Sequence, residues 1–217
     1  MPKVYLSPSN QTDNRYAYGN TTEAEQCGRI AEASRKALER SGVEVMVGHM
    51  PSMQKKVRAS DAFGADLHVP IHTNAFNHSV MGTRMFCYNA TGKGMAACKA
   101  IFARVAPLSP GTSENIQVNP KLYEVRVPKA PTAYIECEFH DTVEGARWIV
   151  NNAAAIGEAI AHGICDYFGV TYKPVEQPKP AHKLYRVQVG AYAVRENAEK
   201  MLQRLKDAGF EGYIREV

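Results

Sequence analysis

A histidine near the end of a predicted strand is the first feature of this sequence that could do chemistry. Open α/β sheets bind their ligands beyond the carboxyl ends of the strands, which is where His72 falls. An isolated histidine is more often a buried residue with satisfied hydrogen bonds, so His72 needs partners before a site can be inferred. The strand itself is predicted at Ala65–Asn74 from the alternation of Leu67, Val69 and Ile71 with other residues.

Carboxylates elsewhere in the chain are candidate partners for this histidine. Glu136 and Glu138 lie two residues apart on the apolar stretch Ala133–Phe139, so in a strand they share one face. Buried carboxylates need a compensating charge, and a cation held between Glu23, His72 and Glu136 would provide it. A catalytic zinc site uses about three nitrogen or oxygen ligands, an open position for water and a further carboxylate as general base. No HExxH segment or other local zinc motif is present, so spacing alone leaves the site a hypothesis.

The elements that must position these residues alternate between strands and helices. Val4–Leu6 and Val43–Val47 are predicted strands, and the segment between them has the N-cap and apolar face of a helix ending near Gly42. This order opens an α/β fold, and we expect a mostly parallel, twisted sheet flanked by helices. The remaining expected elements are helices at 55–63, 94–105 and 143–168, strands at 65–74, 83–88 and 133–139, and a long polar loop at 107–120.

The composition excludes several classes of protein. The chain has 217 residues, of which 45% are hydrophobic and 22% charged, with a formal net charge of +4. It lacks a basic run with interleaved aromatic residues, so no nucleic-acid partner is expected, and it lacks an apolar run of membrane-spanning length. The N-terminus enters a strand without a signal peptide, so we expect synthesis in the cytoplasm. Five cysteines without CxxC spacing are expected to be reduced core residues, namely Cys27, Cys87, Cys98, Cys137 and Cys165.

Two of these stretches resemble a known family, the zinc-dependent N-acetylmuramoyl-L-alanine amidases of bacterial autolysins and phage endolysins. The segment Ala65–Ala75 is similar to the family strand ADLFISIHANA, whose histidine binds zinc, and this implies that His72 is a ligand. The segment Pro131–Phe139 is similar to the family strand PAVLVETGF, whose glutamate is the general base, and this implies that role for Glu136. The family also has a glutamate ligand at the start of its first long helix, where Glu23 lies.

One departure from the family concerns the third zinc ligand. The family's first strand ends in Gly-His-Gly-Gly, and the histidine of that loop binds the metal. Here the loop is Ser9–Thr12, with Asn10 in the place of the histidine, and an amide oxygen is a weaker zinc ligand than an imidazole. The third ligand is therefore open between Asn10, Gln11 and His140.

The resemblance implies a reaction as well as a site. Zinc held by Glu23 and His72 would activate a water molecule, and Glu136 would take its proton. The bond cut joins N-acetylmuramic acid to the L-alanine of the stem peptide, so the partner is peptidoglycan in the bacterial cell wall. The expected protein is a phage or prophage endolysin or a related lysin, and Asn74 and Glu138 are expected to contact the substrate.

Several alternatives are open at this point. The chain could be a metal-free, non-catalytic peptidoglycan-binding protein on an amidase scaffold, or a zinc peptidase that cuts within the stem peptide. Glu136 could instead form a structural ion pair with Arg126 or Lys129. His68 lies in the middle of its strand and is expected to be a buried, hydrogen-bonded residue.

The C-terminal part of the chain differs in composition. Three prolines among lysine, glutamate and glutamine at 171–183 predict a linker. After it, an alternating strand at Leu184–Val189, a helix at 197–208 and a strand at Gly212–Arg215 predict a small βαβ unit.

This unit resembles one repeat of a SPOR domain, a ferredoxin-like domain of two repeats that binds glycan strands of peptidoglycan. Such a unit is small to fold alone, so we expect two chains to pair their tails as a homodimer. The expected organisation is an amidase catalytic domain at 1–170, a linker at 171–183, and a cell-wall-binding and dimerisation unit at 184–217.

Overall fold

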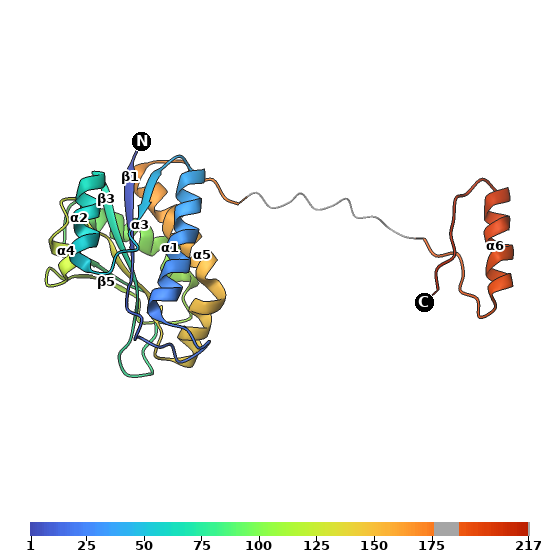
Figure 1. The fold of residues 1–217 in the computed structure, drawn as a ribbon, viewed down its shortest axis with the longest axis horizontal. Helices are drawn as coiled ribbons and strands as arrows, with labels where there is room; N and C mark the ends of the chain where they lie inside the picture. The colour runs from blue at the N-terminus through green and yellow to red at the C-terminus, as the bar shows by residue number, and fades with distance from the viewer. Residues whose placement is uncertain (176–186, 217) are drawn as a thin grey trace. The chain divides into compact units, whose positions relative to one another are not determined.

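Residues 1–175 and 187–216 are described by the computed structural model, in which the chain divides into two units, 1–175 and 176–217. Figure 1 shows both units. The first contains a sheet with flanking helices, and the described part of the second contains one helix. No helix among the described residues is long and apolar enough to span a membrane.

A six-stranded sheet forms the centre of the first unit, in the order β2-β1-β3-β6-β4-β5. Every neighbouring pair is parallel except β4 and β6, which are antiparallel. The prediction of a mostly parallel α/β fold is therefore confirmed. The strands are β1 (Lys3–Pro8), β2 (Glu44–Val47), β3 (Leu67–Asn74), β4 (Arg84–Cys87), β5 (Asn115–Val118) and β6 (Tyr134–Phe139).

Helices cover both faces of the sheet. Two of them, α1 and α3, pack against α5, whereas α2 contacts the short helix α4 (Figure 1). The core between sheet and helices contains all five cysteines as buried free thiols, as predicted. The helices are α1 (Glu23–Arg40), α2 (Met53–Phe63), α3 (Lys93–Val105), α4 (Tyr123–Arg126), α5 (Val143–Phe168) and, in the second unit, α6 (Arg195–Asp207).

The start of α1 is fixed by a capping box. Thr22 Oγ1 accepts a hydrogen bond from the backbone N–H of Glu25 at 3.3 Å, and Glu25 Oε2 accepts one from the backbone N–H of Thr22 at 2.9 Å. Further along, Cys27 and Ile30 are fully buried, and the helix packs against α5. Cap and packing together place Glu23 as the first residue of the helix.

The loop predicted at 107–120 contains regular structure, which corrects that prediction. A 3₁₀ turn, η1, spans Ala106–Leu108, and β5 pairs in parallel with β4 at the edge of the sheet. The residues of β5 are half-buried or exposed, so this edge strand lacks the apolar alternation on which strand prediction depends. The helix α4 was likewise not predicted.

The second unit differs from its prediction in one respect. Its helix is present as α6, but Val187–Val189 and Gly212–Arg215 are not strands; residues 184–186 of the first predicted strand lie outside the described residues. The apolar side chains of these segments are exposed, including Val187 at 84% and Tyr213 at 71%. Strands need a paired neighbour and a covered face, and the described part of this unit supplies neither.

Candidate active site

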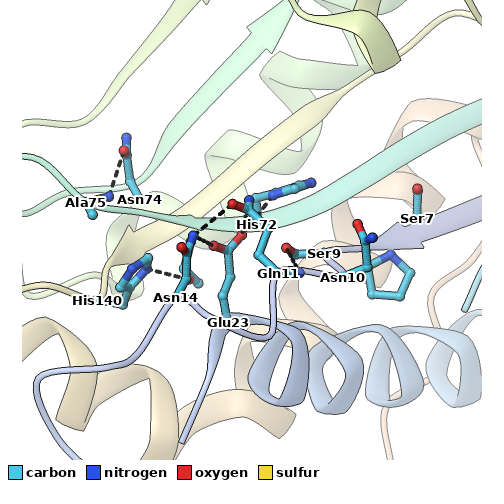
Figure 2. Close-up of polar contacts among 12 residues, drawn as sticks. Ser7, Ser9, Asn10, Gln11, Asn14, Glu23, His72, Asn74, Ala75 and His140 are labelled. Atoms are coloured by element: carbon cyan, nitrogen blue, oxygen red, sulfur yellow. Dashed lines mark hydrogen bonds and ion pairs between the residues drawn. The ribbon is translucent and has the colours of Figure 1, made fainter. Parts of the chain in front are cut away.

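The predicted site residues lie together at the carboxyl-terminal end of the sheet, where β1, β3 and β6 end. These strands are adjacent and parallel, and His72 of β3 is the register partner of Glu136 of β6. After β1 the chain continues through a polar loop to the start of α1, where Glu23 points back toward β3 (Figure 2). Residues distant in the sequence therefore meet where open α/β sheets place their ligands.

A buried hydrogen bond joins Glu23 to His72. The His72 Nδ1 atom lies 2.8 Å from Glu23 Oε1, and the residues are 7% and 1% exposed. Glu23 Oε2 also accepts a hydrogen bond from Asn14 Nδ2 at 2.7 Å (Figure 2). Burial alone would raise the pKa of Glu23, but the hydrogen bond and charge of His72, with the hydrogen bond from Asn14, hold it below its usual value. The Glu23 carboxylate is thus kept ionised next to the imidazole.

Glu136 lies beside this pair, but the pKa of its carboxyl group is raised, whereas the pKa of Glu23 is lowered. Burial of its carboxyl group away from water raises the pKa of Glu136 to about 7, with the charge of His72 opposing the rise and that of Glu23 adding to it. The residue is half-buried, and it forms no ion pair with Arg126 or Lys129 in the part of the chain that the structure describes. A carboxyl group that titrates near neutral pH suits a general base, whereas the structural ion pair is not observed.

Two buried atoms at the site have no hydrogen-bond partner among the described residues: His72 Nε2 and Glu136 Oε2. The His72 ring is held by stacking on Tyr134, with centroids 4.8 Å apart and planes 15° from parallel. Buried polar atoms are nearly always paired, so these two mark a place built to interact with something further.

Asn10, the residue in place of the family's histidine, faces away from the Glu23–His72 pair. Its Nδ2 donates to the carbonyl oxygen of Pro51 at 2.9 Å, and its Oδ1 accepts from Lys56 Nζ at 3.4 Å. Both hydrogen bonds hold the amide on the side of α2, because Pro51 lies just before that helix and Lys56 lies in its first turn. These partners do not favour Asn10 as the third ligand.

Of the other two candidates, one contacts Glu23. His140 stacks on Tyr16 with centroids 4.9 Å apart, and its Nδ1 lies 2.9 Å from Thr73 Oγ1. Gln11 instead donates through Nε2 to Glu23 Oε1 at 3.4 Å. The structure thus brings Gln11 to the pair and gives His140 other partners (Figure 2).

Asn14 is a site residue that the sequence did not reveal. Its Nδ2 donates to Glu23 Oε2 and, at 2.9 Å, to Gln11 Oε1, so one amide group links both side chains. In the sequence it is one of several turn-forming residues between β1 and α1. Its only signal there is its place in the polar loop, two residues after the Ser9–Thr12 segment that stands for the family's Gly-His-Gly-Gly.

The two predicted substrate contacts have different outcomes. Asn74 is half-buried at the end of β3, where its Oδ1 accepts a hydrogen bond from the next backbone N–H, and its contact with substrate stays a prediction. Glu138 is fully buried, and its carboxylate accepts hydrogen bonds from the backbone N–H groups of Gly82 and Phe139 and from Ser109 Oγ. Loops cover the strand face at this point, so Glu138 holds them in place, which does not favour the predicted contact with substrate.

His68 is a buried, hydrogen-bonded residue, as predicted. It is fully buried, with Nδ1 2.9 Å from Ser60 Oγ and Nε2 3.2 Å from Glu124 Oε1, and Tyr5 stacks on its ring.

Separately, a cavity of about 280 Å³ lies near the start of α3 and contains none of the predicted site residues. Neither feature belongs to the site at the strand ends.

The chain is similar to proteins named as N-acetylmuramoyl-L-alanine amidases. The chain is 21% identical to a sporulation-specific N-acetylmuramoyl-L-alanine amidase of Bacillus subtilis (strain 168), over 99% of this chain and 84% of that protein. It is 22% identical to the N-acetylmuramoyl-L-alanine amidase CwlM of Bacillus licheniformis, over 99% and 85%. The catalytic domain of the amidase CwlV from Bacillus (Paenibacillus) polymyxa var. colistinus has the same fold, with a TM-score of 0.70 at 15% identity over 79% of this chain and 100% of that one.

Two family models match the chain in succession. The SPOR domain model matches residues 168–216, which include all the described residues of the second unit up to 216. The model of the N-acetylmuramoyl-L-alanine amidases, Amidase_3, matches residues 4–166, which is most of the chain and includes β1 to β6. The chain therefore belongs to the N-acetylmuramoyl-L-alanine amidase family.

Proposed function

We propose that this member of the amidase family hydrolyses the amide bond between N-acetylmuramic acid and L-alanine in peptidoglycan, with a zinc ion held at Glu23 and His72. The observation that carries the proposal is the half-buried Glu136, with its pKa near 7, next to the buried Glu23–His72 pair. This arrangement places a candidate general base beside two candidate metal ligands at the carboxyl-terminal end of the sheet.

The residues at the site fit the zinc ion that the family implies. A carboxylate and an imidazole are both ordinary zinc donors, and the unpartnered His72 Nε2 and Glu136 Oε2 indicate an incomplete set of contacts. Within the described residues, no third histidine, cysteine or acidic residue joins them. We propose Gln11 as the third ligand through its amide oxygen, with the amide group turned over from its present hydrogen bond to Glu23. This predicts weaker zinc binding than a site with two histidines.

The protein's own groups divide the reaction between them. Zinc, when bound, supplies Lewis acidity at the substrate carbonyl and lowers the pKa of water. Glu136 accepts a proton from the attacking water and delivers it to the leaving nitrogen of L-alanine, for which a pKa of about 7 is well matched near neutral pH. Stacking on Tyr134 fixes the His72 ring, and Asn74 at the end of β3 is proposed to contact the substrate.

Metal content and activity, measured on the same samples, test this proposal. We expect Glu136→Gln to keep zinc but to lose about 10²–10⁴-fold in kcat, because only the proton transfer is removed. His72→Ala is expected to lose both zinc and activity, whereas His49→Ala, at an exposed histidine outside the site, should change neither.

The products separate the alternatives. A new amino terminus on L-alanine supports the amidase, and one further along the stem peptide supports a peptidase. A wild-type protein with no metal and no hydrolysis, even with added zinc, contradicts the proposal and leaves a non-catalytic peptidoglycan-binding protein.

We also propose the division of the chain into a catalytic domain at 1–170, a linker at 171–183, and a wall-binding unit at 184–217 that pairs with a second copy. In support, none of the described residues of the second unit is buried, although its helix is amphipathic. A helix with an uncovered apolar side gains stability by packing against another surface. Its half-buried side chains are Ala198, Met201, Leu202 and Leu205.

A further inference from the structure

The loop between β3 and β4, residues 75–83, adjoins the candidate site at both of its ends. It begins three residues after His72, at Ala75 (Figure 2). It returns at Arg84, which is the register partner of Glu136. In Figure 1 it is the teal-green segment that projects past the end of β3. The second residue of the loop, Phe76, is 74% exposed.

The backbone on both sides of Phe76 is held by one carboxylate. Asp141 Oδ2 accepts hydrogen bonds from the backbone N–H of Phe76 at 2.9 Å and of His78 at 2.8 Å, and the Asp141 side chain is only 10% exposed. His78 also places its Nδ1 3.0 Å from the Asp141 carbonyl oxygen. Asn77 Oδ1 accepts two further backbone N–H groups of the loop, at 3.2 and 3.1 Å.

This loop adopts a conformation that costs free energy. His78 has a φ of 61°, in the left-handed region that residues other than glycine adopt at a cost, although histidine does so more often than most. Because the Phe76 ring is exposed, its packing contributes little free energy to offset that cost. Isolated exposed apolar residues are common on proteins. Here, however, hydrogen bonds to a carboxylate hold the backbone that carries an exposed aromatic ring, and this backbone lies next to the candidate active site.

We propose that Phe76 packs against a sugar ring of the glycan strand when the scissile bond lies at Glu136. This inference rests on the function proposed above, because that bond joins a sugar to the stem peptide. An aromatic ring offers a flat apolar face to the C–H groups of a pyranose, and a loop fixed before binding loses little entropy. The exposed side chains that follow it, Asn77, His78 and Ser79, include no carboxylate, lysine or arginine, which suits an uncharged sugar better than a charged peptide.

Steady-state kinetics on glycan strands that carry stem peptides test the contact. We expect Phe76→Ala to raise KM by about five- to tenfold, with kcat within about twofold of wild type, since binding is lost and the reacting groups are untouched. Phe76→Tyr keeps the ring and should restore KM. Met46→Ala removes a partly exposed apolar side chain from β2 and serves as the matched control, with an unchanged KM.

A binding measurement keeps this test independent of turnover. The full-length protein and each variant are sedimented with insoluble peptidoglycan, and we expect a smaller bound fraction for Phe76→Ala than for wild type and Met46→Ala. Because the Phe76 ring is exposed, we expect the variant and the wild type to have equal melting temperatures. Equal melting temperatures exclude misfolding as the cause of weaker binding.

The outcomes also separate this inference from the proposed function. Unchanged KM and unchanged binding in Phe76→Ala overturn the inference and leave the amidase proposal intact. An equal rise in KM on a stem peptide without sugar overturns the assignment to the glycan strand. Reduced binding in Phe76→Ala, with no hydrolysis by the wild type, supports the contact and contradicts the proposed reaction.

Discussion

Three titratable side chains are buried together near the loop that leads from β1 to the site. Lys56 and His68 are fully buried and Glu124 is 2% exposed. Lys56 Nζ donates to the carbonyl oxygen of Pro8 at 2.6 Å, while Glu124 Oε1 accepts from Ser7 Oγ at 2.5 Å and lies near His68. Buried charges are tolerated when they are paired and hydrogen-bonded, so this cluster fixes α2 and α4 against β1 and β3.

Removing the charge of Glu124 tests the energetic role of the cluster. We expect Glu124→Gln to lower the free energy of unfolding at pH 7 by roughly 2–4 kcal/mol, because His68 and Lys56 lose their shared counter-charge. Urea denaturation measures this directly. Glu144→Gln, at an exposed carboxylate, should change stability by less than about 0.5 kcal/mol.

The effect of Glu124→Gln depends on pH with a definite sign. Burial alone would raise the pKa of Glu124, but the hydrogen bond and charge of His68 and the charge of Lys56 bring it below its usual value. A lowered folded pKa gives stability that is complete above the unfolded pKa of about 4.3 and is lost as pH falls through the folded pKa. The difference between wild type and variant should therefore be smaller at a pH well below about 4.3 than at pH 7. An equal difference at both pH values contradicts this role.

At the scale of elements, the first turn of α1 connects helix capping to the site. Thr22 caps the helix, and Glu23 is the next residue. Ser52 caps α2 in the same way, accepting from the backbone N–H of Lys55, but α2 carries no candidate metal donor. The two caps therefore form a matched pair for mutation.

We expect Thr22→Ala and Ser52→Ala each to lower the free energy of unfolding by about 1 kcal/mol, the usual value of an N-cap. Thr22→Ala should in addition weaken zinc binding by about tenfold, because Glu23 loses its fixed position. Isothermal titration with zinc and thermal unfolding measure the two effects. Equal zinc affinity in both variants would show that the cap does not position Glu23.

At the scale of the whole molecule, the two units differ in how much they bury. The residues of the buried core all lie in the first unit, between Val4 and Cys165. The second unit exposes large apolar side chains, among them Phe210 at 65% and Tyr213 at 71%. The first unit is therefore expected to fold without the second, whereas the second is expected to need a partner surface.

Sedimentation tests this difference. We expect the full chain to be a dimer at tens of micromolar, and a chain that ends at residue 175 to be a monomer with an unchanged melting temperature. Replacing Phe210 and Tyr213 with serine in the full chain should also give a monomer, because apolar contact drives the pairing. A monomeric full chain at that concentration would contradict pairing through the second unit.

Much of the fold follows from local sequence patterns. The strand with His72, the strand with Glu136 and the helix that begins at Glu23 all lie where period and capping predict them, because these signals depend on neighbouring residues. The edge strand β5 was missed, since its half-exposed residues carry no apolar alternation. The strands predicted around α6 are absent from the described residues because a strand also needs a neighbour.

By itself, the sequence determined the fold class, the family resemblance and the meeting of Glu23, His72 and Glu136 at one sheet edge, because parallel strands end together. Only the tertiary structure decided which polar side chains face that edge. It turned Asn10 toward α2, brought Asn14 to Glu23 and covered Glu138 with loops. The physical reason is that a side chain's direction and burial depend on hydrogen-bond partners from distant segments, which no local pattern records.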